Sequence, residues 1–282
     1  MSRAHVGRRL RSALLLLVLI GIAVAILVPI VFMLVSSLKQ PNDVFEFPFR
    51  WIPRRVHPYN YLQAIAGNDG KYTFVRNAFN SLFVAGVIMC LNVLIASAAG
   101  YGLTKFRFKG RQIVFILILA TMMIPFETIM IPLLMLTIKL KIQDTYVGLI
   151  VPVMLTAFAV FLMRQSILTV PEDYIDSARI DGAGEVRIFF SIVLPSVRPT
   201  ALTLAILVFR DSWDNLIWPL IVTQSQRLRT LPLYIVAFLD EKYTNEAALM
   251  AVAVLATVPI FSLFLIFSKY FISEGLLTGS KA

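Results

Sequence analysis

The sequence predicts an all-α, polytopic membrane protein with six transmembrane helices, and that prediction comes from its composition and its long apolar runs. Of 282 residues, 59% are hydrophobic and only 15% are charged, whereas soluble domains carry about 25% charged residues. Apolar runs close to the ~20 residues that cross a bilayer recur along the whole chain. Six spans are predicted: 13–36, 78–101, 112–133, 145–165, 200–222 and 248–271.

The first span begins like a secretory signal, because Arg8, Arg9 and Arg11 precede its apolar run. That run is about 23 residues long, however, and signal peptides have apolar cores of about 7–15 residues followed by a small-residue cleavage site. No such cleavage pattern follows here. We therefore expect residues 13–36 to remain as the first transmembrane helix.

The Lys and Arg residues set the expected orientation and explain the net charge of +10. Cytoplasmic loops of membrane proteins are enriched in these residues, so the positive charge requires no nucleic-acid partner. Two short segments are dense in them, namely Arg3, Arg8, Arg9 and Arg11 before the first span and Lys105, Arg107, Lys109 and Arg111 between the second and third. Although the intervening loop 37–77 also holds six, we place both short segments, and with six spans both termini, in the cytoplasm.

The chain divides into three parts. Residues 1–72 comprise a cytoplasmic N-terminal tail, the first span and an external loop whose Pro- and aromatic-rich sequence predicts one short helix, Tyr59–Ala66. Residues 73–272 form a core of five spans. The run ASAAGYG in the first of these lets helices approach closely, which favours a packed bundle. Residues 273–282 form a cytoplasmic C-terminal tail.

A charged segment interrupts the apolar pattern at residues 166–199, the longest predicted cytoplasmic loop. Its sequence predicts two helices around a turn. Pro171 can occupy the first helical position, and Gly182 ends that helix because glycine readily adopts the left-handed conformation of a helix end. An apolar helix over Glu185–Val193 then ends before Pro195. From composition alone, a solvated loop with an interfacial amphipathic helix is equally well supported.

The spacing within this segment resembles the cytoplasmic signature of permease subunits of ATP-binding-cassette (ABC) importers. That signature reads Glu-Ala-Ala, three residues, Gly, nine residues, Ile, one residue and Leu-Pro. This chain has Asp176-Ser177-Ala178, then Gly182, then Ile192 and Leu194-Pro195 at the same intervals. Asp replaces Glu and Ser replaces the first Ala, so the departures keep the acidic or small character of those positions.

The resemblance implies a type I ABC importer permease fold and a role for the loop in coupling to an ATPase. The first helix of the loop would dock into a cleft on the cytoplasmic ATPase, and Gly182 would set the angle between the two helices. The coupling residues that the resemblance implies are Asp176, Ser177, Ala178, Gly182, Ile192, Leu194 and Pro195.

The fifth span carries charges that are costly at mid-bilayer and therefore indicate function. With a rise of ~1.5 Å per residue, Arg210 lies ~15 Å from the cytoplasmic start at Thr200, near the midplane. The polar positions recur at helical spacing, and Arg210 can pair with Asp214 four residues on. These positions form a polar stripe along one side of the predicted helix. The stripe could line a sugar pathway, bind a neighbouring helix through polar contacts, or result from a misplaced span boundary. Candidate pathway residues are Arg210, Asp211, Trp213, Asp214, Asn215, Trp218 and, in the third span, Glu127, which could also lie near the outer surface.

Three further stretches resemble the carbohydrate-uptake branch of these importers and, within it, the second, maltose-permease-like subunit: IPFETIMIPLLML in span three, WDNLIWPL in span five and GLLTGSKA at the C-terminus. The resemblance implies a bacterial cytoplasmic (inner) membrane protein that forms a heterodimer with a homologous permease. It also implies a dimer of ATP-binding subunits, which use ATP and Mg²⁺, and an extracytoplasmic solute-binding protein that delivers sugar. This chain itself would contact membrane lipid and bind no cofactor.

The sequence lacks the nucleotide-binding and metal-binding motifs that would indicate catalysis by this chain itself. The nearest approach to a phosphate-binding Gly-x4-Gly-Lys-Ser/Thr loop, Gly67 to Tyr72, has the wrong spacing and no Ser or Thr directly after its lysine. His5 and His57 are isolated from cysteine and carboxylate clusters, so no metal site is expected. We therefore expect a non-catalytic permease. The alternatives are an ion-coupled secondary transporter that uses the charges of span five, and a membrane-embedded transferase that uses the same acids.

Overall fold

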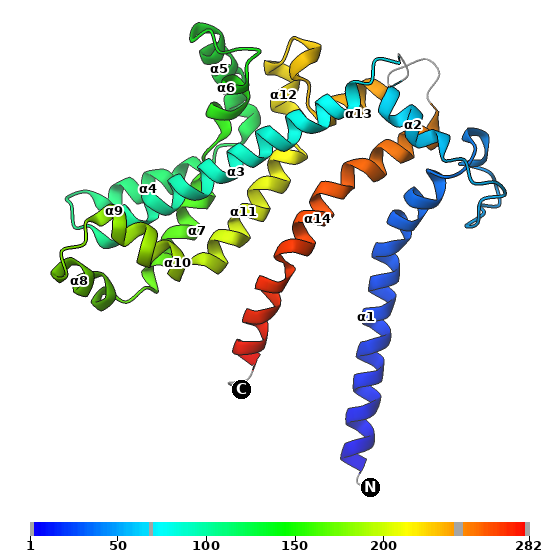
Figure 1. Cartoon of the computed structure of the whole chain (residues 1–282). Helices are drawn as coiled ribbons and strands as arrows, with labels where there is room; N and C mark the ends of the chain where they lie inside the picture. Colours follow the sequence, from blue (N-terminus) through cyan, green and yellow to red (C-terminus); the bar gives the residue numbers. More distant parts are fainter. Residues whose placement is uncertain (1–2, 68–69, 240–244, 280–282) are drawn as a thin grey trace. The chain divides into compact units, whose positions relative to one another are not determined.

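The computed structural model describes residues 3–67, 70–239 and 245–279, and within these ranges the chain forms helices and connecting turns without a strand (Figure 1). It separates into two compact units. The first combines Met1–Phe74 with Ile235–Val258, and the second combines Val75–Tyr234 with Pro259–Ala282. The second unit contains the charged loop and the fifth span, in which most of the candidate site residues lie. The three-part division predicted from the sequence stays a prediction.

Three long helices confirm the predicted first, second and sixth spans. They are α1 (Arg3–Ser36), α3 (Thr73–Lys105) and α14 (Glu246–Gly279). Each contains a segment long and apolar enough to cross a membrane, and the described residues provide up to six spans if each of three bent helix pairs counts as one. Of the predicted C-terminal tail, residues 280–282 lie outside the described residues.

The third and fourth spans are bent pairs of helices. In span three, α4 (Arg111–Thr121) and α5 (Phe126–Lys139) meet at 100°. Pro125 lies at the break with an extended backbone, ψ 141°, and it has no N–H with which to continue the hydrogen-bond ladder of α4. In span four, α6 (Tyr146–Ile150) and the 3₁₀ turn η2 (Val151–Val153) meet α7 (Ala157–Leu168) at 53°.

The fifth span is also broken, which corrects the continuous helix predicted over 200–222. Helix α11 (Arg198–Trp213) ends, and α12 (Ile217–Val222) begins after a three-residue break. Asn215 causes this local break by accepting a hydrogen bond from the backbone N–H of Trp218 at 3.1 Å through its side-chain oxygen, as a capping residue does. Pro219, which has no N–H, cannot continue the α11 ladder. The predicted polar stripe along one helix is therefore wrong.

The charged loop forms α8 (Glu172–Ile180) and then α9 (Glu185–Ile188), a π turn η3 (Phe189–Val193) and α10 (Leu194–Ser196). Pro171 is the capping residue before α8, not its first helical residue as predicted. The second helix also runs past Pro195 instead of ending before it. In the π turn, Leu194 donates its N–H to the carbonyl of Phe189, five residues back, and this altered register accommodates a proline that would interrupt an α-helical ladder. Residues Glu185–Ser196 meet α11 at 82°.

Within the first unit, the segment after α1 contains η1 (Pro41–Asp43) and α2 (Tyr59–Ala66), which confirms the predicted short helix. Buried Asn60 fixes α2 by donating hydrogen bonds from its amide to the carbonyls of Ser37 at 2.8 Å and Lys39 at 2.7 Å. Between α12 and α14 the chain also forms η4 (Gln226–Leu228) and α13 (Leu231–Leu239).

The core of the second unit packs α7 against α3, and small residues permit this contact. Gly100 of α3 lies so close to α7 that an added Cβ would come within 2.9 Å of the Arg164 backbone nitrogen. Met163 and Ile167 are fully buried in the same core. The close approach confirms the packed bundle predicted from the small-residue run around Gly100.

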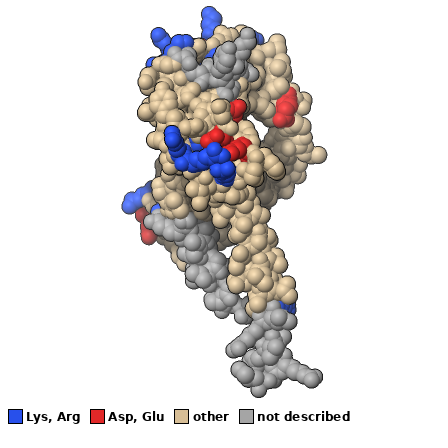
Figure 2. Space-filling model, turned by 90° about the vertical axis from the view of Figure 1, so that its right-hand side faces the viewer, with Lys and Arg blue, Asp and Glu red and all other residues tan. Residues whose placement is uncertain are grey.

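The exposed surface is rich in apolar side chains. Most residues of α1 from Leu14 to Leu34 are exposed and hydrophobic, as expected of a helix that faces lipid or another subunit. Figure 2 shows that the charged side chains on this face gather in a few small clusters. In the segment between α1 and α2, Glu46 pairs with Arg54 at 2.9 Å.

Candidate functional site

The turn between α8 and α9 is a helix cap that requires glycine. Gly182 adopts φ +81° and donates its N–H to the carbonyl of Arg179 at 3.0 Å, while Ala183 donates to that of Ala178 at 2.9 Å. This pair of hydrogen bonds is the Schellman arrangement, which needs a left-handed residue. A Cβ on Gly182 would meet no atom within 4 Å. The backbone conformation, not space, therefore selects glycine.

An ion-pair network fixes α8 relative to its neighbours. Arg179 donates to Asp176 at 2.9 Å and to Glu185 at 2.8 Å, and so links α8 to α9. Glu185 also accepts a 2.6 Å hydrogen bond from the hydroxyl of Tyr101, on α3. The hydrogen bonds to Glu185 and then to Asp176 outweigh partial burial and raise the pKa of Arg179 above its ordinary value.

The predicted coupling residues fall into two groups in the structure. Asp176, Ser177 and Gly182 are exposed on the α8 side, whereas Ile192 and Leu194 are partly buried against the core of the second unit. The partly buried Ala178 also packs against that core, and Pro195 is exposed. The first part of the signature, around Asp176 and Ser177, therefore lies at the surface, whereas Ile192 and Leu194 in the second part pack against the core.

That surface also carries apolar side chains that sequence reasoning did not select. Tyr174, Ile180 and Val186 are 66%, 86% and 73% exposed. In contrast, Ile175 of the same helix is 1% exposed and holds α8 on the unit. Arg179, Glu185 and Tyr101 were missed as well. The Tyr101–Glu185 contact joins residues 84 positions apart, whereas Arg179 and Glu185 are only six positions apart. Exposed apolar residues around a polar helix are typical of a protein contact surface.

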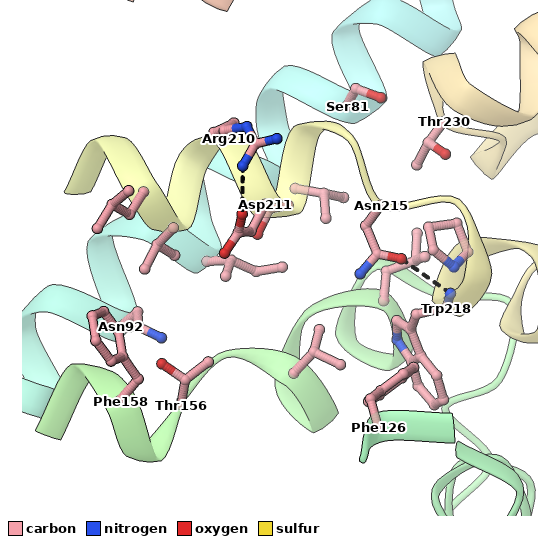
Figure 3. A pocket seen from close by; sticks show the side chains of 18 of the residues that line it. Ser81, Asn92, Phe126, Thr156, Phe158, Arg210, Asp211, Asn215, Trp218 and Thr230 are labelled. Atoms are coloured by element: carbon pink, nitrogen blue, oxygen red, sulfur yellow. Dashed lines mark hydrogen bonds and ion pairs between the residues drawn. The ribbon is translucent and has the colours of Figure 1, made fainter. Parts of the chain in front are cut away.

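A cavity of about 670 Å³ lies within the second unit (Figure 3). Of the predicted pathway residues, Arg210, Asp211, Asn215 and Trp218 line it. The others do not contribute to the lining: Trp213 is buried and stacks on Phe209, Asp214 is the capping residue after α11, and Glu127 is exposed in the first turn of α5.

Charges at the cavity pair loosely. The guanidinium of Arg210 lies 3.7 Å from the carboxylate of Asp211 and 3.6 Å from that of Asp214, which confirms the predicted pair four residues apart. All three side chains are more than half exposed. Loose, exposed pairs in a candidate membrane span are expected to face water or another subunit rather than lipid.

Trp218 is fixed in the cavity wall. It is 1% exposed and donates its ring N–H to the carbonyl of Gly148 at 3.1 Å. Phe126 packs edge-on to its ring, with 6.1 Å between centroids. The cavity also contains polar groups that the sequence did not single out, namely Ser81, Asn92, Thr156, Ser212 and Thr230. In the part of the chain that the structure describes, no three His, Cys, Asp or Glu side chains gather as metal ligands.

Long apolar helices around a partly polar cavity, with a charged helix pair at the surface, are the arrangement expected of a membrane transport component. More narrowly, the chain belongs to the family described as the binding-protein-dependent transport system inner membrane component, whose model matches residues 92–273. This match spans α8, the π turn and most of the residues that line the cavity.

Three relatives match most of the chain. It is 37% identical over 262 residues to the arabinooligosaccharides transport system permease protein AraQ of Bacillus subtilis, covering 90% of this chain and 89% of the relative. It is 37% identical over 204 residues to the lactose transport system permease protein LacG of Rhizobium radiobacter, covering 72% and 74%. The sn-glycerol-3-phosphate transport system permease protein UgpE of Agrobacterium fabrum is 30% identical over 271 residues, with 94% and 95% covered.

Solved structures confirm the fold. A chain of a bacterial ABC transporter involved in the import of the acidic polysaccharide alginate matches with a TM-score of 0.81 and 21% identity, covering 96% of this chain and 99% of that one. The MetNI methionine ABC transporter matches with a TM-score of 0.54 over 72% of this chain. The predicted ABC importer permease fold is therefore correct.

Proposed function

We propose that this chain is a transmembrane permease subunit of an ATP-driven importer that moves a sugar or sugar-like solute across the bacterial cytoplasmic membrane. The observation that carries the proposal is the signature at residues 176–195, which occupies an exposed, ion-paired helix and a buried anchor. Relatives named for arabinooligosaccharide, lactose and sn-glycerol-3-phosphate transport support the substrate class.

The importer contains three further components. A second, homologous permease forms a heterodimer with this chain, a dimer of ATP-binding subunits hydrolyses ATP with Mg²⁺, and an extracytoplasmic binding protein delivers the solute. This chain performs no chemistry and holds no cofactor. Its termini and α8 lie in the cytoplasm, where the short basic segments place them.

Coupling proceeds through α8. The exposed side of this helix, with Asp176 and Ser177, docks into the ATPase, and closure of the two ATPase subunits moves it as a rigid body. The Arg179–Glu185 pair carries the movement to α9, and the Tyr101–Glu185 hydrogen bond carries it to α3. Gly182 holds the angle between the two helices, while Ile192, Leu194 and Pro195 continue the movement into the bundle.

The solute passes through the cavity of the second unit. Arg210, Asp211 and Asn215 offer hydrogen-bonding groups, and Trp218 supplies an apolar wall on which a sugar ring can pack. Asp214 acts through its pairing with Arg210. A role for Trp213 and Glu127 in the pathway stays a prediction.

The test is to express the chain with its chromosomal neighbours, purify it through a tag on this subunit and reconstitute the product in liposomes. The proposal predicts co-purification of a second permease and an ATPase, and uptake that requires ATP and the binding protein. Gradient-driven uptake by this chain alone would contradict the proposal and support the secondary-transporter alternative. Catalytic turnover by this chain alone would support the transferase alternative.

A further inference from the structure

Asn92 is an unsatisfied polar group in the interior of the second unit. Its side chain is 0% exposed, and neither its amide nitrogen nor its amide oxygen has a hydrogen-bond partner. Among the residues that the structure describes, Asn92 is the one side chain whose two polar atoms are both buried and both lack a hydrogen-bond partner. A buried amide without partners is unfavourable unless a ligand or water satisfies it.

Two other buried polar side chains of α3 find partners within the chain. Asn80 donates to the carbonyls of Arg227 and Arg229, both at 2.8 Å. Ser97 donates to the carbonyl of Val93 at 2.6 Å. These side chains hold the fold together, whereas Asn92 holds no part of the chain in place.

Asn92 lines the cavity that Arg210 and Asp211 also line. In Figure 3 its amide and the hydroxyl of Thr156 point toward one another from α3 and from the turn before α7. Thr156 accepts the N–H of Ala159 at 3.3 Å and keeps its own proton to donate. Phe158, which is 42% exposed, adds an aromatic face to the same lining.

This set of groups matches one chemical class of ligand. An amide can donate two hydrogen bonds and accept others, so it can satisfy two neighbouring hydroxyls of a polyol or sugar ring. An aromatic face can cover the apolar side of such a ring. A purely apolar ligand would leave the amide unpaired.

We propose that Asn92, with Thr156 and Phe158, forms a subsite for solute hydroxyls, so that this subunit contacts the transported solute directly. The inference rests on the proposed function, because it assumes that the cavity is the solute pathway. It makes Asn92 a specificity residue that the sequence did not identify.

The test uses the reconstituted importer with its partner chains, in the presence of ATP and the binding protein, and the probes arabinotriose, lactose and glycerol 3-phosphate. Asn92→Cys in a Cys90→Ser chain is labelled with N-ethylmaleimide with and without each probe. The transported probe should slow labelling about tenfold, because it occupies the subsite. Cys90 of the unaltered chain is the control: it is exposed, two residues away on α3 and outside the cavity lining, so its labelling should not change.

A second measurement compares Asn92→Leu with Ser97→Ala, which removes a buried hydroxyl from the same helix outside the cavity. Asn92→Leu should lower uptake about tenfold, since it leaves solute hydroxyls unpaired. It should still co-purify with the ATPase, and Asn92→Ser should restore part of the uptake. Ser97→Ala should retain uptake.

The outcomes separate the two proposals. If the unaltered complex shows no ATP-driven uptake of any probe, the proposed function fails and this inference fails with it. If uptake occurs, but no transported probe slows labelling of the Asn92→Cys variant and Asn92→Leu transports normally, only the subsite is overturned and water satisfies the amide.

Discussion

The loop around α8 and the cavity differ in how their polar groups are satisfied. In the loop, Arg179 and Glu185 are bonded to one another and Glu185 is bonded to α3. In the cavity, Asn92 has no partner and Arg210 pairs only at distances above 3.5 Å. A satisfied network suits a part that transmits movement, whereas unsatisfied groups suit a part that receives a ligand.

The largest expected effect comes from breaking the loop at Gly182. Gly182→Val forces a β-branched residue to φ +81°, at a cost of at least ~1–2 kcal/mol, so α8 leaves its fixed angle. Uptake should fall more than about tenfold relative to ATP hydrolysis. Gly184→Ala is the matched control, because Gly184 has φ −70° and open space around it. Equal uptake by the two variants would show that the turn geometry does not matter.

Substitution of Arg210 in the cavity should give the next largest effect on uptake. Arg210→Gln removes the cation that pairs with Asp211 and Asp214, and about fivefold slower uptake is expected because two carboxylates lose their partner. Lys139→Gln, at the exposed end of α5, serves as the control. Radiolabelled uptake and ATPase recovery are measured together. Loss of the ATPase from the Arg210→Gln complex would indicate a structural role instead.

The contact between α3 and α7 supports both regions, and a smaller effect on stability is expected there. Gly100→Ala places a Cβ 2.9 Å from the Arg164 nitrogen, and such overpacking costs ~1–3 kcal/mol. The thermal midpoint of unfolding in detergent should fall. A Cβ on Gly102 meets nothing within 4 Å, so Gly102→Ala should keep or raise that midpoint. A higher midpoint for Gly100→Ala would mean that the helices are less close than described.

The smallest effect is expected from the link between the loop and α3. Tyr101→Phe removes one hydrogen bond to Glu185 but leaves the bond from Arg179 to that carboxylate. Coupled uptake should fall about twofold, because the carboxylate keeps its charged partner. Tyr234→Phe on α13, away from the loop, provides a comparison. A complete loss of uptake in Tyr101→Phe would show that this hydrogen bond carries most of the coupling.

The sequence predicted the spans whose apolar runs are uninterrupted. Pro125 signals the bend in the third span, but the breaks in the fourth and fifth spans were missed. Composition is the same on both sides of a bend, so spans four and five read as continuous helices. In span five, the side chain of Asn215 and the missing N–H of Pro219 decide the break, and both are local signals that could have been found. The π turn before Pro195 has no comparable signal.

The residues of the candidate site were also predictable from the sequence only in part. Gly182 could be identified because a glycine after a short polar helix is a local pattern. Asn92 could not, since one buried asparagine looks like another until its neighbours are known. Asn80 finds carbonyls about 150 residues away, and Asn92 finds none. Tertiary structure alone makes that distinction.

The central claim is that α8 is the contact through which an ATPase drives this permease. We would replace Tyr174, which is 66% exposed on α8, with a photo-crosslinking phenylalanine in the assembled complex. Tyr59, 61% exposed at the start of α2, is the matched control. The account predicts a crosslink to the ATP-binding subunit from position 174 and none from position 59. Crosslinking to that subunit from position 59 alone, or from neither, would contradict it.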